Sequence, residues 1–84
     1  MELDYYFFLE RKRSKLTQKK FADKIGISNH ALSSYVNKKR TPELLTALKI
    51  YFETKKEVKL YDLLSKEDFE DLNNLYGVIK EVEI

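Results

Sequence analysis

The chain has no cysteine and a single histidine among its 84 residues. The missing thiols exclude disulfides, thiolate catalysis and cysteine zinc sites, and one imidazole cannot form a histidine-rich metal site. Two glycines and one proline leave few breaks in the chain. The longest uninterrupted apolar run, residues 5–9, is far shorter than the roughly 20 residues that a membrane helix needs. We therefore expect no metal, no other cofactor and no membrane segment.

Positive and negative charges are separated along the sequence. Residues 11–40 hold ten Lys and Arg against one acid, a net charge of +9, whereas residues 1–10 carry −3 and residues 61–84 carry −5. A basic segment of this kind is typical of a surface that binds phosphates, because bound cations release the counterions condensed on a nucleic acid. A solvated basic surface balanced by acidic ends is the alternative. The acidic start also lacks the bases of a secretory signal, so we expect a cytoplasmic protein.

Apolar residues recur at three- and four-residue steps nearly throughout, which predicts an all-helical chain with short turns. The expected helices cover about residues 3–15, 18–24, 29–37, 43–52 and 66–76, with a bend and one helical turn within 58–64. We expect residues 1–76 to form one domain and residues 77–84 to form a tail. The even spacing of Val78, Val82 and Ile84 leaves open a short strand or an extended tail, which is a candidate dimerisation element.

The spacing also predicts which side chains point inward. In the first helix we expect Tyr5, Phe8 and Leu9 inside, and we prefer a core role for this aromatic run over a base-stacking one. Thr41 followed by Pro42 predicts a cap and a first-turn proline for the fourth helix. The side chains expected inside that helix are Leu44, Leu45, Leu48 and Phe52. Those expected inside the last helix are Phe69, Leu72, Leu75 and Tyr76.

Residues 17–37 have the pattern that a helix-turn-helix motif requires. Thr17 and Ser28 can each accept a backbone N–H at the start of a helix. Ala22 is small enough for two helices to cross closely, and Gly26 tolerates the backbone conformation that ends the first of them. The shared apolar seam is expected from Phe21, Ile25, Ile27, Leu32 and Tyr35. All of these positions fit a helix-turn-helix motif, and they lie within the segment whose net charge is +9.

The segment LTQKKFADKIGISNHALSSYVNKKRTP, residues 16–42, resembles the helix-turn-helix of the lambda-repressor and Cro superfamily, often called XRE-type regulators. The similarity is greatest at residues 16–18, 21–28 and 37–38. The later stretch KEVKLYDLLSKEDF is similar to small Cro-like antitoxins and phage regulators. The resemblance covers about residues 5–70. It implies a compact, all-α, four- to five-helix lambda-repressor-like domain that binds double-stranded DNA, usually as a homodimer.

The resemblance also implies roles for single residues, and the polar outer face of residues 29–37 agrees with them. The residues expected to approach base edges are Asn29, His30, Ser33 and Ser34. The residues expected to contact phosphates are Gln18, Lys19, Asn37, Lys38, Lys39 and Arg40. No arginine occurs in the recognition helix, where many relatives carry Gln or Arg, while Asn29 can read adenine. We therefore expect A·T pairs and DNA shape to matter. For His30, a solvated surface position and a metal ligand are the alternatives.

The leading hypothesis is a sequence-specific transcriptional regulator, a phage- or mobile-element-type repressor that inserts residues 29–37 into the major groove and is associated with the nucleoid. The alternative is a protein-interaction module, an antitoxin or anti-repressor that acts on a toxin or antagonist. An enzyme is not expected, since no nucleophile has a neighbouring base in the sequence. The candidate dimer seams are the tail and the surface of Tyr5, Tyr6 and Phe7.

Overall fold

The computed structural model describes residues 1–76, which contain six helices; side chains are described for residues 1–74. In chain order the helices are α1 (Leu3–Arg13), α2 (Gln18–Ile25), α3 (Asn29–Val36), α4 (Leu44–Glu53), α5 (Leu60–Leu63) and α6 (Lys66–Tyr76). No strand occurs within residues 1–76, so the all-helical prediction is confirmed. The strand or tail expected at 77–84 lies outside the described residues.

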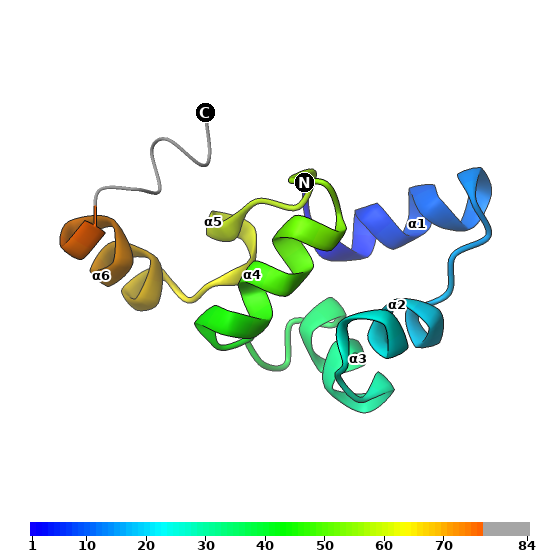
Figure 1. Cartoon of the computed structure of the whole chain (residues 1–84), viewed down its shortest axis with the longest axis horizontal. Coiled ribbons are helices and arrows are strands. Elements are labelled where there is room, and N and C mark those ends of the chain that lie inside the picture. Colours follow the sequence, from blue (N-terminus) through cyan, green and yellow to red (C-terminus); the bar gives the residue numbers. More distant parts are fainter. Residues whose placement is uncertain (77–84) are drawn as a thin grey trace.

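The helices are spread along a molecule whose longest extent is 37 Å. Figure 1 shows α4 and α5 in the middle, α6 at one end, and α2 with the end of α1 at the other. α3 lies beside α2 and is followed by the segment that leads back to α4 (Figure 1). Within this part of the chain, no helix combines the length and the apolar character that a bilayer crossing requires.

The ends of α2 and the start of α3 have the local chemistry that the sequence predicts. Thr17 Oγ1 accepts a hydrogen bond from the Lys20 N–H at 3.2 Å, and Ser28 Oγ accepts one from the Ala31 N–H at 3.0 Å. Gly26 ends α2 at a φ of +79°, and a Cβ placed there would meet no atom within 4 Å. The positive φ, rather than crowding, therefore selects glycine at this position.

Side chains of α1 to α5 form one core, with α2, α3 and α4 at its centre. The side chains of Phe21, Leu32, Ile50 and Tyr51 are at most 1% exposed. Ala22 is fully buried, which lets α2 approach its neighbours closely. The remaining seam residues, Ile25, Ile27 and Tyr35, are partly buried against the same core. The predicted seam of the helix-turn-helix motif is confirmed.

α1 turns a different face to the core from the one expected. Its buried side chains are Leu3, Tyr6 and Phe7. Tyr5 and Phe8, which we expected inside, are each 53% exposed. Both sets have the same i, i+3, i+4 spacing, so periodicity could not choose between them. The choice comes from ring packing, because Phe7 and Tyr6 meet the Phe21 ring edge to face, at centroid distances of 5.1 and 6.2 Å.

α4 also differs from the prediction in its start and its buried face. Glu43, not Thr41, stands at the N-cap, and its side chain makes no capping hydrogen bond. The buried positions of the helix are Thr46, Ala47, Ile50 and Tyr51. Leu44, Leu45 and Phe52 were expected inside but are 40%, 62% and 58% exposed. Apolar residues occupy most of the circumference of α4, so the sequence pattern does not determine its orientation.

α5 and the start of α6 agree with the sequence prediction. Ser65 Oγ accepts a hydrogen bond from the Asp68 N–H at 3.1 Å at the N-terminus of α6. Phe69 and Leu72 are partly buried against the core, and Tyr61 of α5 meets the Phe69 ring edge to face at 6.4 Å. α6 therefore joins the rest of the molecule through α5.

Candidate nucleic-acid interface

α3 presents a polar face on the side away from the core. The helix buries Leu32 and Val36. The side chains on the opposite side are those of Asn29, His30, Ser33, Ser34 and Asn37. Asn29, His30 and Asn37 are exposed, and the two serines are half-buried. The five polar positions that the sequence analysis assigned to the recognition surface and its end therefore share one accessible face.

α3 and the segment that follows it surround an open hollow of about 380 Å³, lined by His30, Ser33, Ser34, Asn37, Lys39 and Arg40. The backbone N–H groups of Lys39 and Arg40 donate to the Ser34 carbonyl oxygen at 2.9 and 3.4 Å. The Arg40 guanidinium lies 5.6 Å from the centre of the Tyr35 ring. These contacts place two cations beside a polar helix face, the combination that contact with a DNA backbone and its bases requires.

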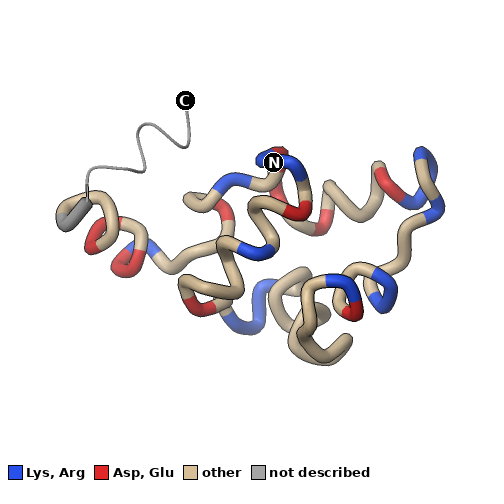
Figure 2. Tube along the Cα trace, in the orientation of Figure 1, with Lys and Arg blue, Asp and Glu red and all other residues tan. Residues whose placement is uncertain are grey.

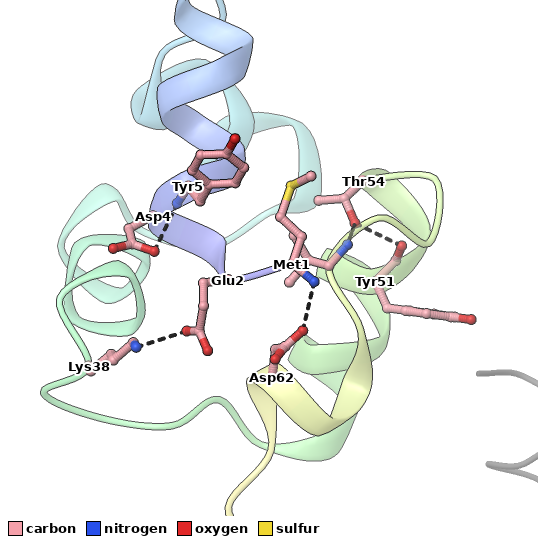
Figure 3. A network of polar contacts seen from close by, with 9 residues as sticks. Met1, Glu2, Asp4, Tyr5, Lys38, Tyr51, Thr54 and Asp62 are labelled. Carbon is pink, nitrogen blue, oxygen red and sulfur yellow. Dashed lines mark hydrogen bonds and ion pairs between the residues drawn. The ribbon is translucent and has the colours of Figure 1, made fainter. Parts of the chain in front are cut away.

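Lys38 does not share this hollow. It has a φ of +60°, and its Nζ lies 2.9 Å from Oε2 of Glu2, just before α1 (Figure 3). The pKa of Lys38 is raised, first by this hydrogen bond and then by the negative charges of Glu2 and Asp4. Lys38 and Lys39, which were expected in one phosphate-binding loop, thus face different spaces, and Arg40 borders both of them.

A second ion pair attaches the same end of α1 to α5. The α-amino group of Met1 lies 2.9 Å from Oδ2 of Asp62 (Figure 3). Between these elements lies a pocket of about 270 Å³ whose lining includes Glu2, Lys38 and Tyr61. The carboxylates of Glu2 and Asp62 both face this space, so Lys38 lies in acidic surroundings.

The first turn of α2 forms a second edge of the candidate interface. Gln18 is half-buried at its first position, and Lys19 and Lys20 are exposed. Figure 2 shows basic residues along α2, at the end of α1 and in the segment between α3 and α4, whereas α6 carries mainly acidic ones. The acidic helix α6 therefore lies apart from the basic residues of α2, whereas the acidic start of the chain reaches Lys38.

Two further cations lie beside Gln18 and were not proposed from the sequence. Arg11 and Lys15 line a hollow of about 420 Å³ together with Gln18 and Thr17. The available signal was their closeness in sequence to Gln18, since Arg11 lies in the last turn of α1 and Lys15 in the short connection between α1 and α2. They extend the basic edge of α2 toward α1.

The described residues offer no candidate metal centre. Within residues 1–76, no group of three or more His, Asp or Glu side chains is arranged to hold a metal ion. The single histidine, His30, lies on the exposed face of α3 instead. The chemistry available at this surface is hydrogen bonding and charge.

Comparison with known protein families identifies the helix-turn-helix region of the chain. A family model described as Helix-turn-helix matches residues 9–50, half of the chain. The matched region contains α2, α3 and their connecting turn, together with parts of α1 and α4. No curated protein and no solved structure gives a significant match to the chain.

Proposed function

The chain belongs to the XRE/lambda-repressor-like helix-turn-helix family, and on this premise we propose that it is a sequence-specific transcriptional repressor of the phage or mobile-element type. Family membership makes it a DNA-binding regulator whose partner is double-stranded DNA. In the proposal, residues 1–76 form the DNA-binding domain, residues 77–84 form a tail, and the protein acts at the nucleoid in the cytoplasm.

The observation that carries the proposal is the accessible polar face of α3 with two cations at its end. In the proposed complex α3 lies in the major groove, and its base-reading residues are Asn29, His30, Ser33 and Ser34. The positive end of the α3 dipole then points toward the duplex. Asn29 can pair with adenine through two hydrogen bonds. A site in which A·T pairs matter is therefore expected.

Backbone phosphates would be bound on both sides of α3. The proposed contacts are Gln18 and Lys19 on α2 and Asn37, Lys39 and Arg40 beyond α3. Lys38 joins this group only when its ion pair with Glu2 is broken. An ion pair between two solvent-exposed side chains is weak, so a phosphate can compete for the lysine.

Selection of bound duplexes from a random pool tests the function. We expect one enriched sequence. Asn29→Ala should relax the preference at one position and cost about 1–3 kcal/mol, whereas Lys39→Ala should weaken binding to all duplexes alike. Failure to retain any duplex at low salt would contradict the proposal, and an equal loss on every sequence for Asn29→Ala would remove that residue from base reading.

We also propose that two copies bind one operator, with half-sites centred roughly 34 Å apart. Tyr6 and Phe7 are buried, so the seam expected on α1 is reduced to Tyr5. α4 instead exposes Leu45 and Phe52 one heptad apart. A ten-residue helix is about 15 Å long, and such a face falls well short of the roughly 800 Å² per partner of a standard interface. We therefore expect the dimer to form on DNA and the free protein to be monomeric.

Binding to one and two half-sites tests this arrangement. The double variant Leu45→Ser, Phe52→Ser should bind a single half-site normally and lose cooperativity on a double site. Truncation after Gly77 is the parallel test of the tail. A dimer in solution by light scattering that survives the double substitution would rule out the α4 seam.

A protein partner is the second candidate function, favoured by an exposed aromatic pair on α1. The rings of Tyr5 and Phe8 stack at 6.3 Å, and Lys12 Nζ lies 4.5 Å from the centre of the Phe8 ring. An antitoxin or anti-repressor would use this surface to bind a toxin or antagonist. Substitution of both rings by serine should then abolish regulation in cells without changing DNA affinity. Unchanged regulation would contradict this function.

A further inference from the structure

The two serines of the recognition helix differ in their hydrogen-bonding capacity. A hydroxyl has one proton to donate and two lone pairs that can accept. Ser34 Oγ lies 3.2 Å from the backbone carbonyl oxygen of His30. A carbonyl oxygen can only accept, so the Ser34 hydroxyl donates its proton into the helix. Toward the hollow beside α3, the Ser34 hydroxyl can therefore only accept a hydrogen bond.

Ser33 has the opposite arrangement. The Asn37 side chain donates from Nδ2 to Ser33 Oγ at 3.3 Å. This contact occupies a lone pair of Ser33 and leaves its hydroxyl proton available to an outside acceptor. Both serines line the same hollow as Lys39 and Arg40. One helix turn therefore presents an acceptor and a donor at neighbouring positions.

The acceptor at Ser34 limits what that residue can contact on a duplex. Phosphate oxygens only accept, as do guanine N7 and O6 and thymine O4. The donors in the major groove are the exocyclic amino groups, N6 of adenine and N4 of cytosine. Lys39 and Arg40 already supply donors for phosphate beside the hollow. A Ser34 that keeps its bond to His30 cannot act as a phosphate ligand.

We propose that Ser34 determines specificity by accepting a hydrogen bond from an exocyclic amino group of the operator, on adenine or cytosine. This inference rests on the proposed function, because it requires α3 in the major groove. A free serine hydroxyl can pair with many bases. With its proton donated to the His30 carbonyl oxygen, the Ser34 hydroxyl can pair only with a donor group. Guanine and thymine present only acceptors to Ser34 and are excluded at that position.

Base analogues test the proposal on the selected duplex with the full 84-residue chain. Each adenine is replaced in turn by the purine analogue without its 6-amino group, and each cytosine by the pyrimidine analogue without its 4-amino group. At one position the unmodified protein should lose about 2- to 10-fold in affinity, the range of one net hydrogen bond. Ser34→Ala should bind the natural duplex correspondingly more weakly and show no further loss with that analogue.

Matched variants separate this contact from other effects. Both proteins meet the same duplex, so any weakening of the duplex by the analogue affects both equally. Ser33→Ala should retain the analogue penalty, and Ser34→Thr, which keeps a hydroxyl, should retain it too. The helical circular dichroism of each variant checks that α3 is intact. The base type at the sensitive position distinguishes adenine from cytosine.

Two results overturn the proposal in different ways. If every analogue penalty is the same in Ser34→Ala as in the unmodified protein, Ser34 does not read an amino group, while the selected sequence keeps the proposed function. If no duplex is selected at all, the proposed function fails and this inference fails with it.

Discussion

Gly26 and four lysines adopt the left-handed backbone region at helix ends. Lys15, Lys38, Lys55 and Lys56 have φ values of 55° to 67°, and each follows α1, α3 or α4. For a residue with a Cβ this conformation costs roughly 1–2 kcal/mol. Gly26, at φ +79°, avoids the cost at the turn that sets the angle between α2 and α3. Glycine therefore occupies the left-handed position within the helix-turn-helix turn, whereas the strained left-handed lysines lie at other helix ends.

Gly26→Ala should lower the free energy of unfolding by about 1–2 kcal/mol, because its backbone rather than its surroundings resists a side chain. Gly26→Asn is the matched variant, since Asn visits this region more readily, and its loss should be smaller. Urea unfolding measures both. Equal losses for the two variants would mean that space, not φ, restricts this position.

In the proposed complex, Glu2 competes with DNA for Lys38. Its carboxylate lies 2.9 Å from the lysine amine, and both side chains are accessible to solvent. Glu2→Gln should therefore raise the affinity for all duplexes alike at low salt, by about 2- to 5-fold, since exposed ion pairs are weak. The gain should vanish in a Lys38→Ala background, and titration of labelled duplexes measures it. A gain that persists without Lys38 would show that Glu2 acts on DNA through another residue.

At the scale of the helix, local chemistry was predictable and orientation was not. Thr17, Ser28 and Ser65 cap α2, α3 and α6 as expected, because a cap depends on residues close in sequence. The faces of α1 and α4 were wrong, since each helix is apolar on more than one side. Which side is buried depends on tertiary partners, such as the Phe21 ring under Phe7.

Two adjacent phenylalanines test the orientation of α1. Phe7 is 5% exposed and Phe8 is 53% exposed. Phe7→Ala should cost about 3–5 kcal/mol of stability because it leaves a cavity against Phe21, whereas Phe8→Ala should cost about 0.5 kcal/mol. Thermal or urea unfolding of the two variants provides the comparison. A larger loss at Phe8 would restore the face expected from the sequence.

In the candidate interface, too, features set by local sequence were predictable and those set by tertiary contacts were not. The outward polar set on α3 was readable, because helical periodicity places positions 29, 30, 33, 34 and 37 on one side. The departure of Lys38 toward Glu2 was not readable, since the two residues are distant in sequence and meet only after folding. Hydroxyl directions in α3 likewise require coordinates. The roles of these residues on DNA stay predictions.

At the scale of the whole molecule, α6 gathers acidic residues at one end, whereas the other acidic residues lie among basic ones, as in the pairs Arg13–Glu10 and Lys24–Glu53. α6 carries Glu67, Asp68, Glu70 and Asp71 at one end of a 37 Å long axis (Figure 2). The Debye length at physiological salt is about 8 Å, so charges separated by much of that axis are screened from one another. The small net charge of +2 therefore understates the field at α2 and α3.

The salt dependence of binding should follow the local charge. Replacing Glu70 and Asp71 by their amides should leave the slope of log K against log salt unchanged. Lys19→Ala and Lys39→Ala should each reduce its magnitude by about 0.9, the contribution of one phosphate contact. Titrations over a salt series with one fixed duplex measure both effects. A slope that responds to the α6 variant would place α6 near the DNA.

The manner in which α6 is attached has a dynamic consequence. Among the described side chains, Phe69 and Leu72 bring it to the core, with Tyr61 beside Phe69 as an exposed neighbour. Such a peripheral helix can open by itself, so its amide protons should exchange with solvent deuterium well before those of α2. The helix-turn-helix formed by α2 and α3 would then stay folded while α6 unfolds locally. Heating or a protease would therefore act on α6 first.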